Sequence, residues 1–83
     1  MELRYEPRAL RALKKLQHFD RVTIVAALKA LAAGDAPNAD LKKLVDVHPA
    51  TWRLRVGRFR ALYQRIDGVF VVVDVSDRAD AYR

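Results

Sequence analysis

Residues 52–75 read WRLRVGRFRALYQRIDGVFVVVDV and carry the two-residue period of β-strands. Trp52, Leu54 and Val56 alternate with Arg53 and Arg55, which is the pattern of a half-buried strand with a basic outer row. A glycine then interrupts the pattern, and two further strand-like runs follow, separated by Asp-Gly. This dipeptide is a strong signal for a two-residue hairpin turn. The stretch therefore predicts three consecutive strands of an antiparallel sheet.

The Asp67-Gly68 turn also predicts the register of the strands Arg58–Ile66 and Val69–Val75. Counting outward from the turn, the expected pairs are Ile66 with Val69, Gln64 with Val71, Leu62 with Val73 and Arg60 with Val75. Alternation puts Arg60 on the same face as Leu62, the expected core face. We therefore expect Arg60 at the open end of its strand, or past a bulge near Gly57.

The first half of the chain has helical periodicity after a short strand at Glu2–Glu6, where Leu3 and Tyr5 share a face. Pro7 suits the first turn of a helix over Pro7–Gln17, because its missing N–H costs nothing there. The apolar positions of this helix recur at helical spacing: Ala9, Leu10, Leu13 and Leu16. Another face of the same helix carries cations: Arg8, Arg11 and Lys15.

A second helix is expected over Arg21–Ala33, with Asp20 as its N-cap and Gly34 where it stops. Its inward stripe is Ile24, Val25, Leu28 and Leu31. After a loop, Leu41–Leu44 is expected to form one turn of helix. The chain is thus predicted to be a single α+β domain over 1–83. Its architecture would be a helical hairpin packed on a twisted antiparallel sheet, in the order β-α-α-β-β-β.

The charge of the chain is its first functional clue. Sixteen Lys and Arg against ten Asp and Glu give a net charge of +6. Such a field attracts polyanions, namely nucleic acid, acidic protein segments or anionic membrane surfaces. The absence of cysteine excludes disulfides and thiolate metal sites, which suits a reducing cytoplasm. No apolar stretch approaches the ~20 residues of a membrane span, so a cytoplasmic location without membrane association is expected.

Several familiar chemistries find no support in the sequence. His18 and His48 are isolated histidines without a carboxylate cluster at ligand spacing, so neither a metal nor another cofactor is expected. No phosphate-binding glycine loop and no Ser or Cys nucleophile motif is present. Arginine and tyrosine are instead concentrated in the last third of the chain: Arg53, Arg55, Arg58, Arg60, Arg65, Arg78, Tyr82 and Arg83.

The order of these residues resembles the RelE branch of the RelE/ParE toxin superfamily. Residues 52–64 are similar to the core of that family, a basic strand followed by a Gly-aromatic-Arg-x-x-Tyr segment. Residues 78–83, RADAYR, resemble its C-terminal Arg-x-x-x-Tyr-Arg ending, and the early helical segment ALRALKKL at 9–16 also fits. The resemblance extends over essentially the whole chain. It implies the toxin of a type II toxin–antitoxin system that cleaves messenger RNA, with the ribosome as the expected place of cleavage.

The resemblance also implies roles for individual residues. Tyr82 matches the base that takes the 2′-hydroxyl proton, Arg60 the arginine that stabilises the phosphate, and Arg78 the arginine near the leaving group. The RNA-binding positions it implies are Arg53, Arg55, Arg58 and Arg83. Asp77 stands where relatives often carry a basic residue, and a carboxylate there can neutralise part of the charge of the site. The reaction needs no metal, and the implied partner is an acidic antitoxin that forms a hetero-oligomeric complex with the toxin.

Two other functions remain open at this point. A ParE-like inhibitor of DNA gyrase would have the same fold and a protein target, although such toxins tend to lack the terminal tyrosine. A non-catalytic module that binds RNA or the ribosome would use an aromatic and basic face formed by Phe59, Tyr63, Phe70 and Arg65. The same aromatic row could equally be a packing layer beneath a bound antitoxin.

Overall fold

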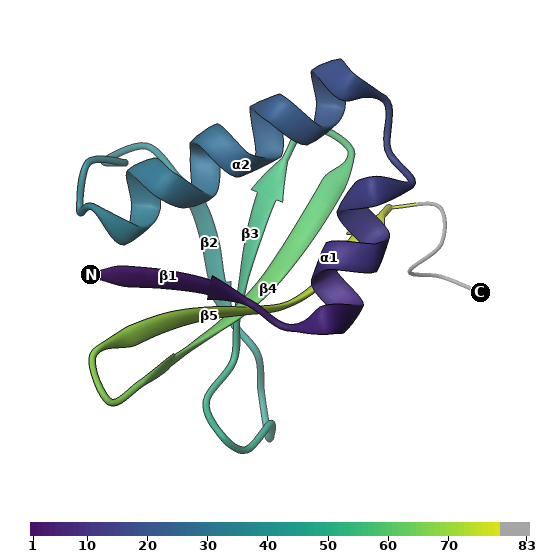
Figure 1. Ribbon diagram of the computed structural model, residues 1–83. Helices are drawn as coiled ribbons and strands as arrows, with labels where there is room; N and C mark the ends of the chain where they lie inside the picture. The colour runs from purple at the N-terminus through teal and green to yellow at the C-terminus, as the bar shows by residue number, and fades with distance from the viewer. Residues whose placement is uncertain (79–83) are drawn as a thin grey trace.

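The computed structural model describes residues 1–78, and these form an α+β fold, which confirms the predicted fold class. Two helices pack on a five-stranded sheet, as Figure 1 shows. The strand order across the sheet is β1-β5-β4-β3-β2. The elements in chain order are β1 (Glu2–Tyr5), α1 (Pro7–Lys14), α2 (His18–Ala32), β2 (Asp40–Lys43), β3 (Trp52–Val56), β4 (Phe59–Ile66) and β5 (Val69–Asp77).

The sheet is mixed, whereas the sequence predicted an antiparallel one. β2, β3, β4 and β5 pair antiparallel in turn, but β1 lies parallel to the first half of β5. The expected helical turn at Leu41–Leu44 is also wrong, because Asp40–Lys43 is the edge strand β2. Pairing of Leu41 with Leu54 on β3 decides its conformation, since a four-residue segment takes its structure from its neighbours rather than from its own propensity.

The predicted hairpin between β4 and β5 is confirmed next to its turn, but its register differs from the prediction farther from the turn. Ile66 pairs with Val69 and Gln64 with Val71, as expected. Asp67 and Gly68 both have positive φ, 51° and 77°, which a turn of the Asp-Gly type requires. Beyond Tyr63 the register shifts by one residue, so that Leu62 pairs with Asp74 and Arg60 with Ser76. The extra residue, Val73, forms a β-bulge near the middle of β5, not near Gly57.

Both helices differ from the prediction in their bounds, mainly at the connection between them. α1 begins at Pro7 as expected but ends at Lys14, and α2 begins at His18 with Gln17 as its N-cap residue. Asp20 is therefore not a cap; it lies in the first turn of α2, where a carboxylate interacts favourably with the helix dipole. A terminal nitrogen of Arg21 donates to the carbonyl oxygens of Leu13 and Leu16, each at 3.5 Å, and so ties α2 to the end of α1.

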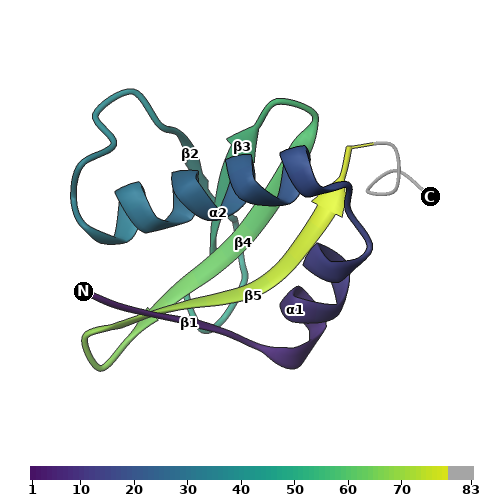
Figure 2. The ribbon, with the colours of Figure 1, turned by 45° about the horizontal axis from the view of Figure 1, so that its top comes forward.

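The helices are not a side-by-side antiparallel hairpin. α2 lies across the sheet, while α1 is inclined to it and lies alongside the C-terminal end of β5, as Figures 1 and 2 show. β1 covers only Val69–Val72 of β5. The chain turns directly from β1 into α1, and the backbone N–H of Glu6 donates to the carbonyl of Val72 at 2.9 Å. α1 therefore lies beside the part of β5 that β1 does not cover.

The core lies between the helices and one face of the sheet, and it contains the predicted apolar stripes. Its buried members are Ala9, Leu13, Ile24, Leu28, Leu31, Leu54, Phe59, Ala61, Tyr63, Phe70, Val72 and Val75. Leu10, expected among them, is exposed. On β4 the core face carries Phe59, Ala61 and Tyr63, which leaves Arg60 and Leu62 on the opposite, open face. The core face expected for β4 was therefore wrong by one residue, and Arg60 needs no bulge in its own strand to reach the surface.

Candidate functional site

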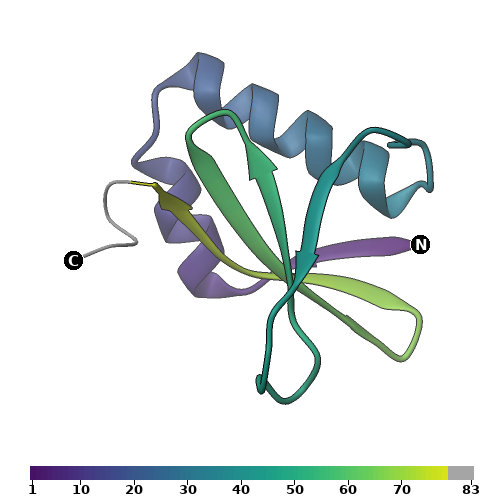
Figure 3. The ribbon, with the colours of Figure 1, turned by 180° about the vertical axis from the view of Figure 1, so that it is seen from behind.

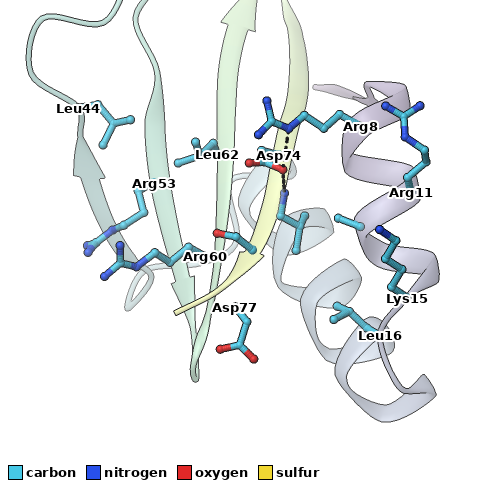
Figure 4. Close-up of a pocket in the computed structure, with 13 residues that line it drawn as sticks. Arg8, Arg11, Lys15, Leu16, Leu44, Arg53, Arg60, Leu62, Asp74 and Asp77 are labelled. Atoms are coloured by element: carbon cyan, nitrogen blue, oxygen red, sulfur yellow. Dashed lines mark hydrogen bonds and ion pairs between the residues drawn. The ribbon is translucent and has the colours of Figure 1, made fainter. Parts of the chain in front are cut away.

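The open face of the sheet holds a cavity of about 850 Å³ between β3, β4, β5 and α1. Figure 3 views the molecule with this face of the sheet toward the reader, and Figure 4 shows the lining residues. Five of the described residues that line the cavity are cationic: Arg8, Arg11, Lys15, Arg53 and Arg60. Its carboxylates are Asp74 and Asp77. The volume lies in the range of small-ligand pockets, ~300–1,000 Å³.

Arg53 and Arg60 enter the cavity because they occupy outward positions of adjacent strands. Arg53 pairs with Leu62, and Arg60 pairs with Arg55, so the two arginines are diagonal neighbours across β3 and β4. Diagonal neighbours are within reach of each other when the side chains are long. Both side chains point the same way in Figure 4. The structure thus brings together the proposed phosphate-stabilising Arg60 and the proposed RNA-binding Arg53.

The side chain of Arg53 is unusually enclosed for a cation, with 14% of its surface exposed. One terminal nitrogen donates to Asp40 Oδ1 on the edge strand at 2.9 Å. Its Nε is buried and has no hydrogen-bond partner among the described residues. A buried donor of this kind is costly to leave unsatisfied, and an anion in the cavity is one group that can satisfy it.

Asp74 lies on the cavity floor, at the first paired position after the bulge. Its Oδ1 accepts the backbone N–H of Val75 at 2.9 Å and faces Nε of Arg8 at 3.4 Å. The carboxylate therefore joins β5 to α1, as the dashed lines in Figure 4 mark. Asp77, at the end of β5, forms an ion pair with Arg58 at 2.8 Å, so part of its charge is compensated by a cation outside the cavity.

The remaining predicted site residues are more scattered. Arg55 shares the face of Arg53 and is half-buried, but it is not among the residues that line the cavity. Arg58 lies in the β3–β4 turn, with its guanidinium 5.2 Å from the centre of the Phe59 ring. It lines a different cavity, of about 560 Å³, between that turn and the α1–α2 connection.

The C-terminal site residues lie at or beyond the end of the described chain. The backbone N–H of Arg78 donates to the carbonyl of Arg58 at 2.7 Å, and its side chain is exposed and outside the 850 Å³ cavity. Tyr82 and Arg83 lie outside the described residues.

The two described tyrosines are poor candidates for a general base. Burial raises the pKa of Tyr5 and the pKa of Tyr63 above the ordinary value, with Arg65 acting in the opposite direction on Tyr63. Both side chains pack in or against the core. Neither phenol therefore has the exposure or the pKa direction that proton abstraction at neutral pH requires.

The aromatic row expected as a possible binding face belongs to the core. Phe59, Tyr63 and Phe70 are buried, and the rings of Tyr63 and Phe70 stack with centroids 4.1 Å apart. They pack in the core of this chain, beneath its helices. The hypothesis of a non-catalytic RNA-binding module depended on this aromatic face. The face is buried and is therefore not available at the surface.

Sequence reasoning missed the contribution of α1 to the cavity. Arg8, Arg11 and Lys15 were recognised as one face of a helix, but nothing in the local sequence shows that this face borders the open side of the sheet. No role was predicted for Asp74. Among the described residues no group of three His, Cys, Asp or Glu side chains is arranged to hold a metal ion. Within the described part of the chain, no helix has the length and apolar character to span a membrane.

Solved structures of similar fold are toxins. An archaeal RelE–RelB complex from Pyrococcus horikoshii matches with a TM-score of 0.77 and 20% identity, covering 93% of each chain. Isolated Escherichia coli RelE matches with a TM-score of 0.72 and 23% identity, covering 98% of this chain and 89% of that one. The RelBE2 toxin–antitoxin complex from Mycobacterium tuberculosis matches with a TM-score of 0.67 and 28% identity, covering 95% and 92%.

A comparison with curated protein sequences finds no match. The model of one protein family, described as the ParE toxin of the type II toxin–antitoxin system parDE, matches residues 3–82. That range runs from the second residue of β1 through β5 and includes all but the last residue of the predicted C-terminal motif. The chain therefore belongs to the RelE/ParE superfamily and is the toxin of a type II toxin–antitoxin system.

Proposed function

We propose that this toxin is a metal-independent endoribonuclease that cleaves messenger RNA on the ribosome. The observation that carries the proposal is the cationic cavity, in which Arg53 and Arg60 lie on adjacent strands. A single-stranded RNA backbone is the polyanion that suits an open groove with arginines on its floor. A ribosomal target agrees with the cytoplasmic location expected from the sequence.

The proposed reaction transfers the phosphoryl group within the RNA. The 2′-oxygen attacks the adjacent phosphorus, the bond to the 5′-oxygen breaks, and a 2′,3′-cyclic phosphate and a 5′-hydroxyl result. Tyr82 accepts the 2′-hydroxyl proton, and the departing 5′-oxygen takes a proton from solvent. Arg60 and Arg78 stabilise the negative charge that develops on phosphorus and the leaving oxygen. An arginine does not yield its own proton readily, so Arg78 acts by charge.

Cleavage of messenger RNA in the presence of purified toxin tests this proposal. We expect cuts within translated message, ends that carry a cyclic phosphate or 3′-phosphate, and unchanged cleavage in EDTA. Ribosome integrity is checked by sedimentation, because chelation also dissociates ribosomes. Loss of cleavage in EDTA that a divalent ion restores, with ribosomes intact throughout, would refute the mechanism.

Inhibition of DNA gyrase is the second candidate, because the matching family model is that of ParE toxins. Induction of the toxin in cells distinguishes the two functions. Intact messages together with accumulating double-strand DNA breaks after induction would favour the gyrase target. Cut messages with intact DNA favour the ribonuclease.

The proposed partner is an acidic antitoxin in a hetero-oligomeric complex, in line with the RelE–RelB complexes of similar fold. The net charge of +6 provides the complementary field. An inhibitory segment that folds on binding would cover the basic cavity and so exclude RNA.

A further inference from the structure

The cavity has two cationic walls on different elements. Arg53 and Arg60 come from the sheet, whereas Arg8, Arg11 and Lys15 come from α1 and its C-cap residue. The positions 8, 11 and 15 follow the three- and four-residue spacing that places side chains on one stripe of a helix. None of the three is needed for the core, since all are exposed. The α1 wall therefore presents charge to the cavity at no cost in packing.

Arg8 is held over the cavity floor by a specific contact. Its Nε faces Asp74 Oδ1 at 3.4 Å, and the same oxygen accepts the backbone N–H of Val75. Figure 4 shows Arg8 reaching from α1 toward β5 while its two terminal amino groups extend past Asp74. A guanidinium bound through Nε still offers these terminal groups to an anion, in the planar geometry that matches phosphate. Asp74 is therefore placed to orient Arg8 rather than to neutralise it completely.

The surface between the two walls carries both apolar and polar side chains. Ala12 of α1, Leu16 after α1, Leu62 of β4 and Leu44 after β2 line the cavity together with Asp74 and Ser76 of β5. Cations on two sides of such a floor suit a chain with charged groups at intervals and, between them, flat groups that can both pack and hydrogen-bond. A nucleic acid strand is such a chain. A single phosphate would occupy one wall only.

We propose that Arg8, Arg11 and Lys15 form a second phosphate-binding wall, which holds a phosphate flanking the scissile one in single-stranded RNA. Asp74 acts as the positioning residue for Arg8. This inference rests on the proposed ribonuclease function and extends it, because it assigns substrate contacts to α1. The sheet wall serves the reacting phosphate, and the helix wall fixes the strand beside it.

The test is single-turnover cleavage at increasing toxin concentration, with the variants Arg8→Gln, Arg11→Gln and Lys15→Gln. Each should raise the half-saturating toxin concentration about 5- to 10-fold, the scale of one ordinary hydrogen bond at an exposed site. The rate at saturation should stay within about twofold of the wild-type rate, because excess toxin hides a binding defect but not a chemical one. Each should also reduce the salt slope of binding by about 0.7, the value for one phosphate contact on a single strand.

Lys14→Gln is the matched control. Lys14 precedes Lys15, carries the same charge and is also exposed, but does not line the cavity. Equal effects of Lys14→Gln and Lys15→Gln would mean that only net charge matters, and the second wall would be wrong. If the wild-type toxin cleaves RNA and the three α1 variants show the same half-saturating concentration, the second wall is wrong while the proposed function stands. If the wild-type toxin cuts no RNA at all, the proposed function fails and the inference fails with it.

A double-mutant cycle tests the role of Asp74. Asp74→Asn keeps an acceptor for the N–H of Val75 but removes the charge that faces Arg8. In this background the penalty of Arg8→Gln should shrink by at least about twofold, whereas that of Lys15→Gln should not change, because coupling is confined to residues in contact. Equal penalties for Arg8→Gln in both backgrounds would show that Asp74 does not position Arg8.

Discussion

At the scale of single residues, the cavity brings together cationic side chains whose mutual repulsion disfavours folding. Arg53 and Arg60 are diagonal neighbours on adjacent strands, and both are largely enclosed. Guanidinium groups in this arrangement repel each other, and burial strengthens the repulsion because it lowers the local dielectric. Asp40 compensates Arg53 from the edge strand at 2.9 Å. A sequence that keeps such a cluster in a small domain gains something other than stability, and phosphate binding is the gain we propose.

The residue-scale prediction concerns the proposed base. Tyr82→Phe removes one oxygen and keeps the ring, so folding and antitoxin affinity should stay close to wild type. Single-turnover cleavage at saturating toxin should fall by roughly 10²–10⁴-fold, the contribution of general base catalysis. Tyr63→Phe is the comparison, because that phenol lies in the core and should leave the rate unchanged. A wild-type rate for Tyr82→Phe would mean that Tyr82 is not the base.

The site could be predicted from sequence only in part. Arg53 was found because outward positions of a strand are visible as a period of two, whereas Arg60 was assigned through the family resemblance and alternation put it on the wrong face. The α1 wall could not be assigned in the same way, since its place beside β5 depends on how the helix packs. The face of Arg60 was mistaken because both Leu62 and Tyr63 are apolar enough for the core, and only packing under α2 decides between them.

At the scale of elements, the bulge at Val73 determines what β5 contributes to the site. Without it, Val73 and Val75 would share the open face with Arg60. With it, Asp74 pairs with Leu62 and Ser76 with Arg60, so polar side chains line the cavity and Val75 turns into the core. The bulge could not be predicted from the sequence, because a regular hairpin places a valine at each of the same positions with no local conflict.

Deletion of Val73 should be tolerated, because this residue is the extra one of the bulge. Without it, a regular ladder still pairs Asp74 with Leu62 and Ser76 with Arg60, so both polar side chains stay on the open face and Val75 stays in the core. We expect the deletion to cost about as much as Val73→Ala, which keeps the bulge and should cost less than about 1.5 kcal/mol by urea denaturation. A loss of several kcal/mol on deletion alone would show that the side chains beyond Val73 had changed face.

At the scale of the whole molecule, the hydrophobic core on the helix side of the sheet stabilises the strands that form the cavity on the other side. The largest fully buried side chains are Phe70, Ile24, Leu28 and Val72, from α2 and from β5, which lies between β1 and β4. A domain of this size has a stability of about 5–10 kcal/mol. A substitution that leaves one large cavity in the core would remove much of this free energy of unfolding.

Phe70→Ala should accordingly cost about 3–5 kcal/mol, because Phe70 is completely buried and stacks on Tyr63. Phe19→Ala provides the matched comparison, since Phe19 is 78% exposed on α2. That change should lie within about 0.5 kcal/mol of wild type. Both are measured as shifts in Tm and in the denaturant midpoint. A loss from Phe19→Ala equal to that from Phe70→Ala would contradict the placement of the core.

The parallel pairing of β1 with β5 joins residues 2–5 to residues 69–72 and has a consequence for synthesis in the cell. A ribosome delivers β1 first and β5 last among these elements, so the edge of the sheet stays open while everything between them is translated. The α1 wall packs on β5 and must wait for the same strand. A nascent chain that has reached only β4 thus carries Arg60 but has no cavity. The proposed site is therefore complete only after the final strand has left the exit tunnel.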